Sequence, residues 1–178
     1  LLSRGLGDVY KRQDIERVDR IVVASHFYRD KALAMKNWPE EKVIVIPNSV
    51  NFEDLNRAKF AEARFHLGIV GIVPILKRPD RAIQLLEKLV EVDPRYVLHI
   101  KGHAPWNYTW EWKKAAHQDA YRAFYKRLGE KNLLAHVAFE PFTPDVGNWF
   151  RKIGWILSPS YRETFHMAAI EGGASGAI

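Results

Sequence analysis

The chain has 178 residues, 47% of them hydrophobic and 27% charged, a composition typical of a folded globular domain rather than a disordered chain. It contains no cysteine and no apolar run near the roughly 18 residues of a membrane span, which excludes disulfides, thiol catalysis and a transmembrane helix within it. The formal net charge of +6 fits an anionic partner such as a phosphate-bearing substrate, an acidic membrane surface or a nucleic acid, and equally a charge that only favours solubility.

Residues 1–13, LLSRGLGDVYKRQ, have no clear periodicity and precede an ordinary α/β pattern. The piece DVYKRQ is what the transposon end used to tag DNA in sequencing libraries encodes, so we interpret the segment as a translated adaptor; a natural helical tail is the alternative. Its charges supply +2 of the +6, from Arg4, Lys11 and Arg12 against Asp8. An adaptor at the front and an abrupt end at the back predict a gene fragment.

The first native elements are a strand, a helix and a second strand. The β-branched run at 21–25 predicts a strand buried on both faces, and Ser25 can cap a helix over 26–36. The run at 43–50 predicts a strand that Pro47 and an Asn-Ser turn end. The polar stretch 51–64 is typical of a linker or a short helix.

Strands and helices then continue to alternate. Strands are predicted at 65–73, 96–102, 136–142 and 154–160. A helix opens at Pro79, with one apolar face formed by Ala82, Ile83, Leu85, Leu86, Leu89 and Val90. The second half of a long insertion, 106–134, predicts a helix because Ala116, Ala120, Phe124 and Leu128 are four apart. Shorter helices are expected over 145–153 and 164–174.

This alternation predicts an α/β fold with a parallel Rossmann-like sheet and flanking helices. Ligands of such sheets bind at the carboxyl ends of the strands, next to helix N-termini. The residues to watch are therefore those that follow strands, at 71–77, 101–103, 142–143 and 158–166.

Two glutamates, Glu163 and Glu171, stand at the two ends of a short apolar run. With a helix from Thr164 to Ala174 they lie roughly 10 Å apart along its axis. A retaining glycoside hydrolase holds its two carboxyl groups about 5–5.5 Å apart, which disfavours that pairing, whereas an inverting pair stays open. One extended ligand, held at two points by carboxylates that accept hydrogen bonds from hydroxyls, fits better.

The N-terminus of that helix is a predicted anion site. Free backbone N–H groups of Thr164, Phe165 and His166 would suit a phosphate, and Lys77 after another strand would add a positive charge. Hydroxyl, phosphate and hydroxyl in that order are the layout of a nucleotide sugar.

Other chemistries have weaker support. His99 and His103 are four apart, but the strand and Gly102 break any helical pairing, so no metal is expected. The cluster WNYTWEW at 106–112 could stack on sugars or bases, or simply pack the insertion onto its domain. A nucleic-acid binder would need a basic stripe, whereas Lys and Arg here are interspersed with Asp and Glu.

Several segments resemble one enzyme family. SPSYRETFHMAAIEGGASG is similar to the E-x7-E signature of the retaining GT-B glycosyltransferases of family 4 (glycosyl transferases group 1). VDRIVVASHFYRDKALAMKNWPEEKVIVIPNSVN resembles the segment that joins the two domains of these enzymes. IVGIVPILKRPDRAIQLLEKL resembles the first strand, loop and helix of the nucleotide-binding domain. The resemblance covers about residues 14–178.

The resemblance implies roles for particular residues. Glu163 and Lys77 would be catalytic, Glu163 on hydroxyls of the donor sugar and Lys77 on the diphosphate. Glu171 would hold the ribose hydroxyls. The donor-binding set is completed by Gly71, Thr164, Phe165 and His166. The chain departs from the family pattern at Ile72, where an Arg is usual and for which Lys101 or Arg78 could substitute, at Pro141 and His166 in place of glycines, and in its longer insertion.

The resemblance also implies an organisation and an activity. Residues 14–50 would be the end of an N-terminal acceptor domain with the linker, and 51–178 a truncated C-terminal nucleotide-sugar-binding domain. The expected enzyme is a cytoplasmic retaining hexosyltransferase for cell-surface polysaccharide or glycoconjugate synthesis, inactive as this fragment alone. Its partners would be a nucleotide-sugar donor and an acceptor glycan or lipid-linked glycan, with no metal cofactor and no nucleic acid, and with peripheral membrane contact left open. A non-catalytic nucleotide- or sugar-binding module is the alternative.

Overall fold

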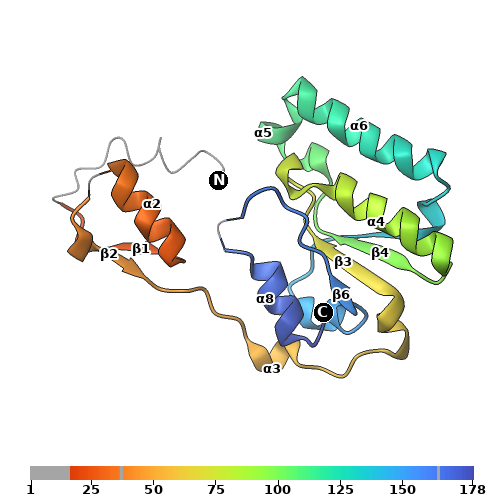
Figure 1. The fold of residues 1–178 in the computed structure, drawn as a ribbon, viewed down its shortest axis with the longest axis horizontal. Helices are drawn as coiled ribbons and strands as arrows, with labels where there is room; N and C mark the ends of the chain where they lie inside the picture. Colours follow the sequence, from red (N-terminus) through yellow and green to blue (C-terminus); the bar gives the residue numbers. More distant parts are fainter. Residues whose placement is uncertain (1–16, 37, 164) are drawn as a thin grey trace. The chain divides into compact units, whose positions relative to one another are not determined.

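The computed structural model describes residues 17–178 except 37 and 164, so the predictions for residues 1–13 and for Thr164 lie outside the described residues. The chain divides into two compact units, Leu1–Ser49 and Val50–Ile178 (Figure 1). None of the described helices has the length and apolar character that crossing a membrane requires.

The first unit is a small parallel β-α-β arrangement. Strands β1 (Ile21–Val23) and β2 (Val43–Val45) pair in parallel, and α2 (His26–Lys36) and a 3-10 turn, η3 (Glu40–Lys42), connect them. The predicted cap is present, since the Tyr28 N–H donates to Ser25 Oγ at 3.3 Å. The prediction that the first strand is buried on both faces is wrong for this chain, because Val22 is 57% exposed on the side opposite its buried neighbour Ile21.

The second unit is built on a four-stranded sheet with the order β5-β4-β3-β6, in which all neighbours are parallel. The strands are β3 (His66–Val70), β4 (Val97–Lys101), β5 (Val137–Glu140) and β6 (Trp155–Ile156). The predicted parallel sheet is confirmed, with each strand shorter than expected. The runs keep their apolar character into the connecting loops, where the ladder stops.

One face of the sheet is covered by α4 (Pro79–Val92) and α6 (Ala115–Glu130), which lie side by side in Figure 1. Their apolar faces form the main core with β3 and β4, made of Leu67, Ile69, Leu98, Ile100, Ala82, Ile83, Leu86, Tyr121, Phe124 and Leu128. Leu85 was expected on the buried face of α4 but is 41% exposed, because the face that meets the sheet is narrower than the apolar pattern. The insertion also contains η6 (Pro105–Asn107) and α5 (Thr109–Trp112).

The opposite face carries α3 (Phe52–Leu55), α7 (Val146–Phe150) and α8 (Met167–Ala174), with a smaller core of Leu55, Trp149, Phe150 and Ile153. The short 3-10 turns η4 (Ala61–Phe65), η5 (Ile75–Lys77) and η7 (Leu134–His136) join elements.

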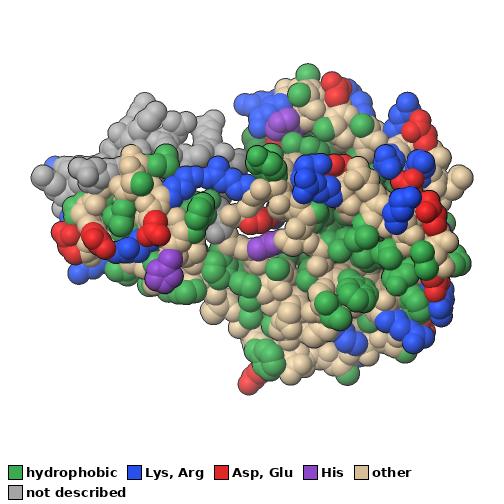
Figure 2. Space-filling view, viewed as in Figure 1, with side chains coloured by type: hydrophobic (Ala, Val, Ile, Leu, Met, Phe, Trp, Pro, Cys, Tyr) green, Lys and Arg blue, Asp and Glu red, His purple; other side chains and the backbone are tan. Residues whose placement is uncertain are grey.

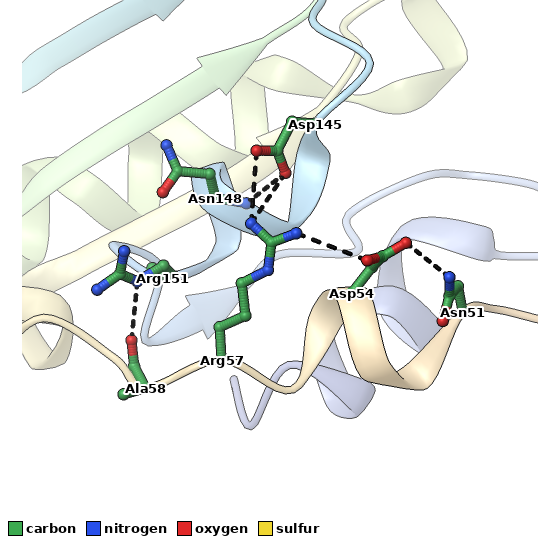
Figure 3. Close-up of polar contacts among 7 residues, drawn as sticks. All are labelled: Asn51, Asp54, Arg57, Ala58, Asp145, Asn148 and Arg151. Atoms are coloured by element: carbon green, nitrogen blue, oxygen red, sulfur yellow. Dashed lines mark hydrogen bonds and ion pairs between the residues drawn. The ribbon is translucent and has the colours of Figure 1, made fainter.

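Polar contacts fix the polar stretch after Val50 to α7 (Figure 3). Arg57 reaches Asp145, the residue that caps α7, and also pairs with Asp54. Arg151 Nε donates to the Ala58 carbonyl at 3.1 Å. The stretch 51–58 is thus held along the domain by side-chain contacts and includes the short helix α3.

Candidate donor-binding site

The strand order brings two loops together at the carboxyl edge of the sheet. β3 and β6 are neighbours and parallel, so the segments that follow them emerge on the same side. The Tyr161 N–H donates to the Leu76 carbonyl at 2.8 Å, which joins the loop after β6 to the η5 turn. The two predicted catalytic residues lie on these two segments.

Lys77 and Glu163 are in direct contact. Lys77 Nζ lies 2.5 Å from Glu163 Oε1, and the two side chains are only 24% and 23% exposed. Ser160 Oγ donates to the same carboxylate oxygen at 2.6 Å. The structure therefore places both residues at one point, although they are 86 residues apart in the chain.

The electrostatics keep Glu163 ionised. Burial alone raises the pKa of its carboxyl, but hydrogen bonds from Lys77 and Ser160 and the charge of Lys77 outweigh this, so the pKa lies below its ordinary value. An ionised carboxylate is a hydrogen-bond acceptor only, which suits ligand hydroxyls.

The segment between Glu163 and α8 differs from the prediction. The helix begins at Met167 rather than Thr164, and His166 is its N-cap residue with φ −80° and ψ 79°, outside helical geometry. Phe165 therefore lies before the helix, and Thr164 lies outside the described residues. His166 contacts Ser158 Oγ through Nδ1, and its Nε2 lies 3.9 Å from Glu163 Oε1. Burial lowers the pKa of His166, and Lys77 adds to this while Glu163 opposes it.

Glu171 lies on α8, which packs against β6. Burial raises the pKa of its carboxyl. Among the described residues its carboxylate has no hydrogen-bond or ion-pair partner, so the carboxylate can accept hydrogen bonds from a ligand.

Gly71 stands directly after β3 with φ +73°, a left-handed conformation that favours glycine. Its N–H donates to the Lys101 carbonyl at 2.7 Å, and a Cβ built on it would meet nothing within 4 Å. Open space over a left-handed glycine allows a ligand close to the backbone.

The next residue, Ile72, is 2% exposed and belongs to the main core, so its side chain does not supply the charge that the arginine of the family pattern would carry. The two candidate substitutes for the missing arginine have other partners. Arg78 is hydrogen-bonded to both carboxylate oxygens of Asp80, and buried Lys101 donates to the Pro141 carbonyl at 3.1 Å.

A cavity of about 230 Å³ opens beyond β4 and β5, at the same edge of the sheet. Its lining includes Gly102 and His103 after β4, Glu140 at the end of β5 with Pro141 after it, and the aromatic side chains Trp106, Tyr125 and Phe139. Sequence reasoning singled out the tryptophans but not Tyr125 or Phe139. The signal for these two was weak, because an aromatic on a helix or a strand most often packs in the core.

His66, His99 and His103 contact neighbouring side chains. His99 is 6% exposed, with Nδ1 2.6 Å from Glu140 Oε1 and Nε2 3.1 Å from His66 Nδ1, whereas the ring of His103 stacks on Phe142. In the described part of the chain, no group of three or more His, Asp or Glu residues could hold a metal ion.

The basic side chains lie among acidic ones. On the face shown in Figure 2, Lys and Arg over α4 and α6 stand next to Asp and Glu. Ion pairs of these two helices are Lys88–Glu91, Lys126–Glu130, Arg127–Glu87 and Lys131–Glu87.

Curated proteins with similar sequences are glycosyltransferases. The chain is 26% identical over 187 residues to a D-inositol 3-phosphate glycosyltransferase of Kribbella flavida, in a match that covers 98% of this chain and 42% of that protein. A second such enzyme, from Streptomyces bingchenggensis, is 26% identical over 181 residues, with 93% and 38% covered. The chain thus spans about two fifths of the length of the curated relatives it matches. No protein-family model matches it.

Solved structures show the same fold. Anabaena Alr3699/HepE in complex with UDP-glucose matches with a TM-score of 0.70 at 15% identity, covering 89% of this chain and 43% of that one. Staphylococcus aureus TarM, crystallised with UDP, matches with a TM-score of 0.69 at 20% identity, covering 92% and 30%. The C-terminal domain of a glycosyl transferase group 1 family protein from Francisella tularensis gives 0.57 at 16% identity, covering 72% and 68%. The parallel sheet with its two helical layers, taken together with these matches, shows that the chain has the α/β fold of a GT-B glycosyltransferase domain.

Proposed function

We propose that the chain is the donor-binding part of a retaining glycosyltransferase that moves a sugar from a nucleoside-diphosphate sugar to an acceptor hydroxyl. The observation that carries this proposal is the contact between Lys77 and Glu163 at the carboxyl edge of the sheet. Solved structures of the same fold are described as complexes with UDP or UDP-glucose, which supports UDP as the nucleotide.

In this proposal Lys77 stabilises the departing diphosphate. The Lys77 ammonium has three N–H groups that can donate hydrogen bonds. One donates to Glu163, so two remain for phosphate oxygens. Negative charge grows on the diphosphate as the bond to the sugar breaks, and a fixed cation at that point stabilises the transition state more than the bound substrate.

The other predicted residues would each contact a different part of the ligand. Glu163 accepts hydrogen bonds from the sugar hydroxyls, and Glu171 accepts them from the ribose. Backbone N–H groups at Phe165 and His166, together with the open space over Gly71, would accommodate the phosphates. Thr164, outside the described residues, is part of the same proposal. No metal is required, because a lysine and backbone dipoles can bind the diphosphate.

The domain assignment is part of the proposal. The unit boundary at Ser49/Val50 lies beside the expected end of the linker, which supports residues 14–50 as the end of an acceptor domain and 51–178 as the donor domain. The acceptor would then be a glycan or lipid-linked glycan bound mainly by parts of a longer protein, and the 178-residue chain alone should not turn over a nucleotide sugar.

Calorimetric titration of the chain with UDP tests the proposal. We expect 1:1 binding that Lys77→Ala weakens about tenfold or more, as loss of a charge-assisted contact would do. Lys88→Ala is the matched control, since that lysine is 74% exposed on α4 and pairs only loosely with Glu91, 3.5 Å away. Absence of UDP binding, or equal loss in both variants, would reject the donor site. An assay of sugar transfer by a longer protein that contains this domain distinguishes an enzyme from a non-catalytic binding module.

A further inference from the structure

Glu111 is a charged residue with no place in the proposed donor site, yet its side chain is 0% exposed. It lies on α5 of the tryptophan-bearing insertion, between Trp110 and Trp112. Burial of a carboxylate is unfavourable unless hydrogen bonds and opposite charges compensate it, so its contacts show what holds it there.

The hydrogen bonds of Glu111 lead to the segment that carries Lys77. The Ile75 N–H donates to Glu111 Oε1 at 2.7 Å. The Tyr121 hydroxyl on α6 lies 3.3 Å from the same oxygen and 2.9 Å from the Ile72 carbonyl. Glu111 and Tyr121 thus hold both ends of the stretch from Ile72 to Ile75.

Two further side chains that approach the carboxylate come from the insertion itself. Lys114 Nζ lies 3.6 Å from Glu111 Oε2, and His117 Nδ1 lies 2.9 Å from Oε1 without hydrogen-bond geometry. Lys114 and His117 belong to the segment of α5 and α6, whereas the shortest hydrogen bond of the carboxylate crosses to the loop after β3. The carboxylate is therefore a link between the insertion and that loop.

The link acts on the turn that ends in Lys77. Ile75 is the first residue of η5 and Lys77 the last, and the Lys77 N–H donates to the Pro74 carbonyl at 2.9 Å. Tyr161 fixes the same turn from the other side through the Leu76 carbonyl. With Ile75 fixed, the turn has little freedom to shift the lysine away from Glu163.

We propose that Glu111 is a positioning residue: its buried carboxylate binds the Ile75 N–H and thereby fixes the η5 turn so that the Lys77 ammonium meets the diphosphate of a nucleotide sugar. The effect on the ligand rests on the proposed function; the fixing of the turn does not. The insertion, in this view, contributes to donor binding without touching the donor.

Hydrogen–deuterium exchange with UDP titration on the 178-residue chain tests both parts. In Glu111→Ala we expect exchange at Ile75 and Lys77 to accelerate roughly tenfold or more, because the Ile75 N–H loses its acceptor, with exchange in β4 and β5 unchanged. The affinity for UDP should fall about fivefold or more. Glu111→Gln, whose amide oxygen can still accept the N–H, should recover most of the protection.

Glu87→Gln is the matched control. Glu87 joins α4 to α6 through Arg127 and Lys131 and is 14% exposed, but it does not contact the η5 turn, so both readouts should stay at the wild-type level. If Glu111→Ala does not fold, Tyr121→Phe keeps the ring and removes the bond to the Ile72 carbonyl, and exchange over 72–77 should still rise severalfold.

Wild-type exchange over 72–77 in a folded Glu111→Ala or Tyr121→Phe variant overturns the positioning role. Faster exchange with unchanged UDP affinity overturns its link to the ligand. Failure of the wild-type chain to bind UDP at all counts against the proposed function, while the exchange data still decide whether Glu111 fixes the turn.

Discussion

Hydrogen bonds connect three side chains across the sheet, from half-buried His66 on β3 through buried His99 on β4 to half-buried Glu140 on β5. Trp149 and Lys152 also donate to Glu140, at 3.1 and 2.5 Å, and Lys101 approaches from β4. Burial raises the pKa of Glu140, but hydrogen bonds from Lys152 and His99 outweigh this and lower it. With Glu140 ionised and His99 neutral, His99 donates through Nδ1 and accepts from His66 through Nε2.

These histidine contacts predict that the folded domain is less stable in mild acid. Burial lowers the pKa of His99 from 6.5, against the opposing effect of Glu140, and burial also lowers the pKa of His66. The unfolded state then binds more protons than the folded state as the pH falls through 6.5, so the free energy of unfolding decreases. Urea unfolding at pH 7.5 and 5.5 should show this decrease, and His99→Gln should reduce it. An equal decrease in both proteins would exclude His99 as its source.

In a longer, active protein, loss of the Lys77 contact with the diphosphate and loss of the Glu163 contact with the sugar should have different kinetic effects. Lys77→Ala should lower kcat/KM roughly a hundredfold or more, the scale of one transition-state charge contact. Glu163→Gln should mainly lower kcat, since it touches the sugar where charge develops. Steady-state kinetics with varied donor measures both; full activity in each variant would show that the site lies elsewhere.

Glu171→Ala should instead mainly raise KM for the donor, because ribose contacts are made equally in the ground and transition states. A large fall in kcat with unchanged KM would contradict the ribose assignment. Steady-state kinetics with varied donor compares the effect of this variant on kcat and KM with that of Glu163→Gln.

Sequence reasoning could pair Lys77 with Glu163 because both follow parallel strands. It could not find Glu111, since a glutamate on a short helix is most often exposed and nothing in WNYTWEW shows that the backbone of a distant loop supplies its partner. The lone carboxylate inside an aromatic cluster was the available signal.

The sequence predicts which helices and strands form, but it does not always predict the residues at which they begin and end. α2 matches its prediction from His26 to Lys36, because Ser25 provides a cap that sequence shows. α8 starts at Met167, three residues later than predicted, because His166 has a non-helical backbone and makes a side-chain contact with Ser158. Such a contact depends on the tertiary fold.

Two glycines in helices give a paired prediction. A Cβ at Gly147 of α7 would lie 2.1 Å from the Asp54 carbonyl oxygen of α3, whereas one at Gly129 of α6 meets nothing within 4 Å. Gly147→Ala should therefore destabilise the fold by about 1–3 kcal/mol. Gly129→Ala should stabilise it by about 0.5–1 kcal/mol through helix propensity. Thermal unfolding measures both, and an unchanged midpoint for Gly147→Ala would contradict the close contact.

For the whole molecule, strand–helix alternation predicts a parallel sheet, and the structure confirms it. The alternation does not give the strand order, which places β6 beside β3 although the strands β4 and β5 and the helices α4 to α7 separate them in sequence. That adjacency, produced by long-range packing, is what brings Glu163 to Lys77.

A crystal structure of the chain with UDP would show whether the donor site lies at the carboxyl edge of this sheet. We predict the diphosphate within hydrogen-bond distance of Lys77 Nζ, and the ribose hydroxyls at the Glu171 carboxylate. Glu163 should remain beside the outer phosphate, where the sugar of the donor would begin. UDP bound at the opposite edge of the sheet, or bound with Lys77 directed away from it, would contradict the proposed donor site.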